Sequence, residues 1–321
     1  MPRNLAALIA ILALAVGTSG CAPRPARPKP AVQQAASKPE IWECPLEQTE
    51  GWEPHGHERL SAEARAVLDR KYGSWSLEKD QTIGTCRALW LNIFPPKDEP
   101  WRLVVLAPDN RIVASIPAGS KDWLTVVGEY DMDGNGTREA LISFYSGGGH
   151  CCTTGCFVDT GSNPRQLGGY EATHGDCGEA GDRDADGRTD FVSRDFSLAY
   201  FEGSFGESPD LPFAYGYRDG RFVDLTREIC GAELREIMAA GRKYLREDPS
   251  RYPRYQDVRN AVNMWYIAAT VFGEEQQAVV EITRLLTPEG RARFMSNMKE
   301  RRECAAQRRK LLWTGVRKDL L

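Results

Sequence analysis

Two short acidic segments carry residue types that bind hard cations. Residues 131–139 read DMDGNGTRE and residues 182–190 read DRDADGRTD, so both place carboxylate or amide side chains at positions one, three, five and nine. Carboxylates, amides and backbone carbonyls are the oxygen ligands that calcium prefers, and the glycine at position six permits a sharp turn. The segments begin 51 residues apart and each precedes a strand-like run, which indicates an internal repeat.

The spacing excludes an EF-hand. That motif needs a glutamate at loop position twelve and a helix after it. Counting from Asp131, position twelve is Ile142, which lies inside the apolar run 140–145. The acid stands at position nine instead.

The pattern D-x-D-x-N-G-x-x-E, repeated as D-x-D-x-D-G-x-x-D, resembles the calcium loops of FG-GAP and VCBS-type repeats, the blades of integrin-like β-propellers. The resemblance covers about residues 125–195 and implies two calcium sites, with side-chain ligands at positions one, three, five and nine and a carbonyl ligand at position seven. The implied ligands are Asp131, Asp133, Asn135, Thr137 and Glu139, then Asp182, Asp184, Asp186, Arg188 and Asp190. The alternative is that each loop is an acidic turn that holds no metal.

The stretch SGGGHCC at residues 146–152 carries a second resemblance. It is similar to a group of secreted bacterial proteins in which such a loop precedes S-G-G-[AG]-H-C-C. This resemblance implies an exported protein.

The first residues predict export. Residues 1–4 are positively charged, and the apolar run 5–16 is too short to span a bilayer as a mature helix. The run ends in Thr18-Ser19-Gly20-Cys21, which resembles a bacterial lipobox and implies lipidation of Cys21. We therefore expect a calcium-binding lipoprotein that acts as a binding or structural module of the cell envelope. Its anchor would be Cys21 in the outer membrane, with the protein facing the periplasm or the cell surface; an ordinary secretory signal is the alternative.

The remaining chain divides by composition and period. Residues 1–20 read as a lipoprotein signal peptide and residues 21–40 as a tether rich in proline and alanine. Residues 41–225 contain short strand-like runs bounded by glycine, which predicts a mainly β domain with short antiparallel sheets resembling propeller blades. In residues 226–321 apolar residues recur at helical spacing, which predicts an all-α subdomain of three amphipathic helices and a fourth that opens at Thr287-Pro288.

Cysteine usage agrees with an oxidising compartment. Besides Cys21, eight cysteines remain, and an even number in an exported chain indicates disulfides. By locality we expect Cys44 to pair with Cys86, Cys230 with Cys304, and the middle four among themselves. The middle four are Cys151, Cys152, Cys156 and Cys177.

The same region supports a competing hypothesis. Imidazole and thiolate ligands suit zinc or another transition metal, so an exported metal-dependent enzyme could use a Cys/His site. Its candidate ligands are His150, Cys152, Cys156, His174 and Cys177. Neither a Cys-x-x-Cys nor a His-Glu-x-x-His spacing is present.

Charge is distributed unevenly and bears on partners. Residues 41–230 carry 18 Lys and Arg against 32 Asp and Glu, whereas residues 231–321 carry 18 against 12. An acidic domain suits cations and argues against a nucleic-acid partner. An envelope protein is a further candidate partner, and the basic run at Arg301-Arg302 and 308–310 could contact anionic lipid or form a solvated helix face.

Overall fold

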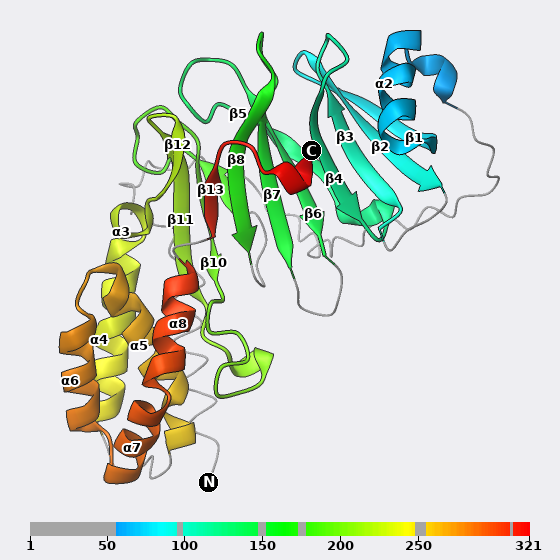
Figure 1. Cartoon of the computed structure of the whole chain (residues 1–321). Helices are drawn as coiled ribbons and strands as arrows, with labels where there is room; N and C mark the ends of the chain where they lie inside the picture. The colour runs from blue at the N-terminus through cyan, green and yellow to red at the C-terminus, as the bar shows by residue number, and fades with distance from the viewer. Residues whose placement is uncertain (1–55, 95–98, 147–151, 173–177, 248–254, 309–310) are drawn as a thin grey trace, which may run out of the picture.

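Three antiparallel sheets follow one another along the chain and lie side by side, with a group of helices at one end (Figure 1). The computed structural model describes residues 56–94, 99–146, 152–172, 178–247, 255–308 and 311–321. Cys21, the tether and the predicted signal peptide lie outside the described residues. None of the helices within the described ranges combines the length and apolarity needed to cross a bilayer.

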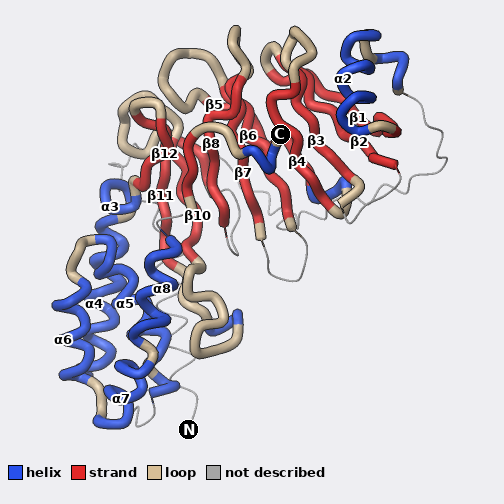
Figure 2. Tube along the Cα trace, in the orientation of Figure 1, coloured by secondary structure: helices blue, strands red, loops and turns tan. Residues whose placement is uncertain are grey.

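Each sheet is an open meander whose first four strands are in chain order. The first sheet contains β1 (Ser74–Ile83), β2 (Cys86–Phe94), β3 (Trp101–Leu106) and β4 (Ile112–Ala118). The second contains β5 (Leu124–Tyr130), β6 (Glu139–Tyr145), β7 (Thr153–Asp159) and β8 (Arg165–Ala172), with β13 (Leu312–Thr314) added beside β8. The third contains β9 (Glu179–Gly181), β10 (Asp190–Asp195), β11 (Leu211–Arg218) and β12 (Arg221–Asp224). The prediction of a mainly β protein with short antiparallel sheets is confirmed (Figure 2).

Alternation along the strands explains how the first sheet is covered on both faces. In β2, Ala88 and Trp90 pack toward the second sheet, while Leu89 and Leu91 pack on the opposite face. That opposite face is covered by α2 (Ala62–Tyr72), which contributes its fully buried Leu68. Because successive side chains of a strand point to opposite faces, a strand buried on both sides reads as a continuous apolar run.

The second sheet is the middle layer. Ile142 and Val158 join the core shared with the first sheet, while Leu141 and Phe157 face the third sheet. There Phe157 meets Phe191 of β10 with ring centroids 5.3 Å apart in an edge-on arrangement. Aromatic pairs of this kind contribute beyond the area that they bury. The two acidic segments therefore belong to sheets that share one core.

The helices follow the third sheet and form their own core. They are α3 (Thr226–Ile229), α4 (Gly231–Glu247), η4 (Tyr255–Asp257), α5 (Arg259–Val271), α6 (Glu275–Leu285), α7 (Pro288–Ser296) and α8 (Met298–Arg308). Trp265, Tyr266 and Phe294 are fully buried within them. Thr287 caps α7 as predicted, because its Oγ1 accepts a 3.1 Å hydrogen bond from the Gly290 N–H. The predicted fourth helix is divided into α7 and α8, since Asn297 leaves helical geometry between them.

The end of the chain corrects the prediction of an all-α final subdomain. After α8, residues 312–314 form β13 and pair antiparallel with β8, and η5 (Lys318–Leu320) follows. The edge of β8 presents backbone hydrogen-bonding groups that a further strand satisfies. Because β8 is far from β13 along the chain, this pairing leaves no local pattern in the sequence. The helical periodicity of the preceding residues therefore could not predict β13.

One long loop joins the third sheet to the helices. Residues 196–210, between β10 and β11, include η3 (Phe205–Glu207) and place Glu202 next to Arg301 of α8. The Arg301 side chain is fully buried, and its Nη2 lies 3.1 Å from Glu202 Oε2. This corrects the hypothesis that Arg301 belongs to an exposed basic surface; residues 309 and 310 of that run lie outside the described residues.

Candidate metal centre

The two acidic segments occupy equivalent places in neighbouring sheets. The first loop (residues 131–139) joins β5 to β6, and the second loop (residues 182–190) joins β9 to β10, so each links the first two strands of its sheet. In both loops the acid at position nine is also the first residue of the next strand. That acid is buried, with Glu139 1% exposed and Asp190 0% exposed.

The hydrogen bonds confirm that the loops are one repeated structure. The carboxylate at position nine accepts a hydrogen bond from the backbone N–H of position two. The bond is 2.8 Å long from Met132 N to Glu139 Oε2 and 3.0 Å from Arg183 N to Asp190 Oδ2. Position one accepts from the N–H of the glycine at position six, over 3.0 Å to Asp131 and 3.1 Å to Asp182. Small polar side chains that bond the following backbone fold such tight turns.

The backbone repeats as well. Position six is left-handed in both loops, with φ of 81° at Gly136 and 85° at Gly187. Position four is left-handed too, with φ of 76° at Gly134 and 64° at Ala185. Glycine adopts this region without the steric cost that a side chain incurs. The second loop therefore keeps the same curvature despite the alanine.

The folded loops gather three acids each. The ligand oxygens of Asp131, Asp133 and Glu139 lie within 4.8 Å of one another. Those of Asp182, Asp184 and Asp190 do the same. Among the residues that the structure describes, these are the two groups of acids, cysteines or histidines close enough to share a metal ion. Each triad could hold a metal ion.

The remaining predicted ligands fall at positions five and seven. Asn135 Oδ1 accepts a 2.6 Å hydrogen bond from the Thr137 N–H, and Asp186 Oδ1 accepts a 2.9 Å bond from the Arg188 N–H. Each position-five side chain is thereby held over the residue whose carbonyl was predicted as a ligand. These four residues lie in the loops as expected but outside the two close triads.

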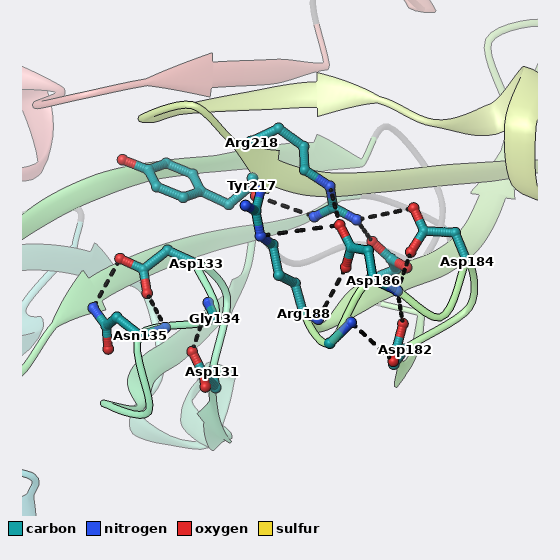
Figure 3. Close-up of polar contacts among 12 residues, drawn as sticks. Asp131, Asp133, Gly134, Asn135, Asp182, Asp184, Asp186, Arg188, Tyr217 and Arg218 are labelled. Atoms are coloured by element: carbon teal, nitrogen blue, oxygen red, sulfur yellow. Dashed lines mark hydrogen bonds and ion pairs between the residues drawn. The ribbon is translucent and has the colours of Figure 1, made fainter.

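The loops lie against each other (Figure 3). The Thr189 N–H of the second loop donates a 2.9 Å hydrogen bond to the Asp131 carbonyl of the first. The Arg188 side chain packs over Gly134, where an added Cβ would lie 3.1 Å from Arg188 Cγ. An ion in the first loop would therefore sit at the junction of the second and third sheets.

The environment of the buried acids differs between the loops. Burial raises the pKa of Glu139 to about 7, with the hydrogen bond from Met132 opposing the shift and Asp133, Asp159 and Asp131 adding to it. Burial also raises the pKa of Asp190, but the Arg183 N–H and the Arg218 guanidinium oppose that shift. A buried carboxylate among other acids favours either a proton or a cation.

Arg218 was not among the residues singled out from the sequence. Its guanidinium contacts Asp190 at 2.7 Å, Asp186 at 3.0 Å and Asp184 at 3.2 Å. The position follows from strand register, because Asp190 pairs with Gly216 and Arg218 lies two residues further along β11 on the same face. The strand pairing that brings Arg218 to residues 182–190 leaves no local pattern in the sequence, so the arginine had no detectable link to that loop.

The cysteines correct the predicted pairings. Cys86 and Cys304 are free, so neither the Cys44–Cys86 nor the Cys230–Cys304 disulfide is formed. Cys86 is buried in the core between the first and second sheets, and Cys304 packs from α8 against the helical core. Cys230 is buried where α3 meets α4. Locality in sequence failed because these side chains are directed into apolar cores.

The structure does not support Cys152 or Cys156 as ligands of the alternative Cys/His metal site. Cys156 is free and fully buried in β7, where burial raises the pKa of its thiol to about 12. Cys152 is disulfide-bonded. Among the described residues, no cysteine belongs to a group of side chains close enough to hold a metal ion. His150, Cys151, His174 and Cys177 lie outside the described residues, as does Cys44.

Comparison with known proteins identifies no relative. No protein-family model matches the chain, and no curated protein or solved structure matches it. Functional inference therefore depends on the geometry of the loops.

Proposed function

We propose that this chain is a calcium-binding structural module of the bacterial cell envelope. The observation that carries the proposal is Glu139, a carboxylate that is 1% exposed and lies with Asp131 and Asp133 in one triad. Its one described hydrogen bond to Oε2 comes from the Met132 N–H. A buried charge without a cation is strongly unfavourable, and a divalent ion would compensate all three acids together.

Calcium fits this set of donors better than magnesium. Calcium accepts six to eight oxygen ligands in a flexible arrangement, including carboxylates, amides, carbonyls and water. The first loop would supply Asp131, Asp133, Asn135 and Glu139 through side chains and Thr137 through its carbonyl. Magnesium demands near-octahedral geometry and retains its waters, so it should compete poorly.

The place of the first loop favours a structural role. Its residues stand between two sheets that share an aromatic core, and the Asp131 carbonyl accepts from the neighbouring loop. An ion that binds only the folded state stabilises it by mass action. The four-strand meanders, each with a loop between its first two strands, support a further proposal that the sheets are propeller-like blades.

Thermal unfolding of the full chain in detergent tests calcium binding. Starting from metal-free protein, calcium at about 100 times its dissociation constant should stabilise the fold by about 2.7 kcal/mol for one site. Asp133→Ala should remove that gain, whereas Asp109→Ala, in the turn between β3 and β4, should retain it. A midpoint that calcium does not move in metal-free wild type would show that the loops are only acidic turns.

We further propose that the module is held at the membrane by a lipid on Cys21. The support is the apolar run followed by Thr18-Ser19-Gly20-Cys21. Cys21→Ser should move the protein from the membrane fraction to the soluble fraction, while Cys304→Ser should leave it in the membrane fraction. Equal membrane fractionation of wild type and Cys21→Ser, with an unmodified mature N-terminus in both, would reject the anchor.

The opposite charges of the two ends support a proposal about partners. Residues 41–230 are acidic and residues 231–321 are basic, so the module presents both signs to an envelope protein. The acidic sheets give no support to a nucleic-acid partner.

A further inference from the structure

The acids of the second loop already contact a cationic side chain, Arg218 at the end of β11. The Arg218 side chain is only 14% exposed, and its guanidinium makes ion pairs with three of the loop's four acids. Figure 3 shows Arg218 reaching over the second loop toward Asp184 and Asp186. Charge-assisted contacts of this kind are among the stronger hydrogen bonds in proteins.

A glycine makes room for this arrangement. A Cβ at Gly216 would lie 2.7 Å from Asp190 Oδ1 and 2.9 Å from Arg218 Nη1. Both distances are shorter than a carbon atom tolerates. The absence of a side chain at Gly216 therefore lets the guanidinium lie across β11 onto the buried Asp190.

The first loop has the opposite arrangement at the equivalent positions. Asp159 pairs with Glu139 just as Gly216 pairs with Asp190. Two residues beyond Asp159 the chain carries Gly161, the counterpart of Arg218, which has no side chain to offer. The first loop thus has an additional acid, Asp159, where the second has a guanidinium, and Asp159 itself pairs with the exposed Arg165 at 3.7 Å. Within the described residues, every ion pair of Arg218 is to an acid of the second loop.

We infer that the Arg218 guanidinium takes the place of a metal ion in the second loop. The first loop is then the calcium site, and the second loop binds calcium only when Arg218 is removed. This inference rests on the proposed calcium-binding function and makes it more specific. A calcium ion and the guanidinium would compete for Asp184, Asp186 and Asp190. Because the guanidinium is covalently attached nearby, its effective concentration at the loop is high.

The test counts calcium ions bound per chain. Metal-free full-length protein in detergent is titrated with calcium chloride by calorimetry, and bound calcium is measured after equilibrium dialysis. Wild type should bind one ion and Arg218→Gln should bind two. Arg194→Gln is the matched control, because it removes an arginine from the same sheet that pairs with Asp210 at 2.8 Å and, among the described residues, with no acid of either loop. This variant should still bind one ion.

Variants of the loop acids keep the test decisive even if Arg218→Gln does not fold. In wild type, Asp133→Ala should abolish binding, whereas Asp184→Ala should leave one ion bound. In the Arg218→Gln background, Asp184→Ala should return the number from two to one. Two ions in wild type with one lost in Asp184→Ala would overturn the inference, as would a folded Arg218→Gln that still binds one.

The outcomes also separate this inference from the proposed function. If wild type binds no calcium but Arg218→Gln binds one, the first-loop site is wrong and the role of Arg218 stands. If wild type and Arg218→Gln both bind none, both are overturned. If wild type binds one ion that Asp133→Ala removes and Arg218→Gln adds none, only the role of Arg218 is rejected.

Discussion

Glu139 and Asp190 occupy the same position in their loops but have different electrostatic neighbours. Each is buried and accepts a hydrogen bond from the second residue of its loop. Asp190 is opposed by the guanidinium of Arg218, whereas Glu139 faces further acids. The same loop conformation therefore places an ion pair with Arg218 in the second loop and a cluster of acids in the first loop.

This difference predicts that neutralising the two buried acids has effects of different size in metal-free protein. Glu139→Gln keeps an oxygen for the Met132 N–H and removes the buried charge, so it should raise the free energy of unfolding by about 1 to 3 kcal/mol at pH 8. It should also abolish the stabilisation by calcium. Asp190→Asn removes a charge that the Arg218 guanidinium already compensates in part, so it should change the free energy of unfolding by less than Glu139→Gln does.

Urea unfolding of both variants in the presence of chelator measures these effects. The wild-type chain under identical conditions is the reference, and a second series with calcium measures the metal response. A loss of stability in metal-free Glu139→Gln would contradict the view that the buried carboxylate lacks a compensating cation.

At the scale of elements, local patterns predicted much of the fold. The sequence of residues 131–139 and 182–190 predicted two loops, each followed by a strand. The prediction was possible because the residue types at fixed positions within nine residues determine such a turn. The strands and helices followed from their periods. Arg218 was missed because its role depends on the pairing of β10 with β11. The loop 196–210 was not assigned any role, since its Glu202 meets α8 only in the folded chain.

The contact of that loop with α8 carries a second prediction. Buried Arg301 donates to Glu202, to Asn263 Oδ1 at 2.9 Å and to the Tyr255 hydroxyl at 2.9 Å. Arg301→Leu should lower the free energy of unfolding by about 3 to 5 kcal/mol, because it leaves Glu202 buried without its cation. Arg302→Leu should cost less than about 1 kcal/mol, since that side chain is 51% exposed in its pair with Glu275.

Denaturant unfolding of the two leucine variants compares a buried with an exposed arginine at adjacent positions of one helix. Both substitutions remove one positive charge, so the net charge is matched between them. Equal losses of stability would mean that the Arg301 contacts with the loop contribute no more than a surface ion pair.

At the scale of the whole molecule, residues 312–320 pack back onto the first and second sheets. After the helices, β13 returns to the edge of β8 (Figure 1). Leu320 is buried in the core between the first and second sheets. Gln166 connects these parts, because its Nε2 donates to the carbonyls of Val113 and Leu320 and its Oε1 accepts from the Arg317 N–H. No local period predicts a contact between residues so far apart along the chain.

The closing segment predicts that a residue near the very end of the chain is important for stability. Leu320 is 2% exposed, whereas the adjacent Leu321 is 40% exposed. Leu320→Ala should lower the free energy of unfolding by about 2 to 5 kcal/mol, because it leaves a cavity in the core shared by two sheets. Leu321→Ala should change it by no more than about 0.5 kcal/mol. Urea unfolding of both variants provides the measurement, and equal effects at the two positions would show that the last residues do not contribute to the core. Since the two acidic loops lie at the other junction, between the second and third sheets, any gain in stability on adding calcium should be the same in Leu320→Ala as in wild type.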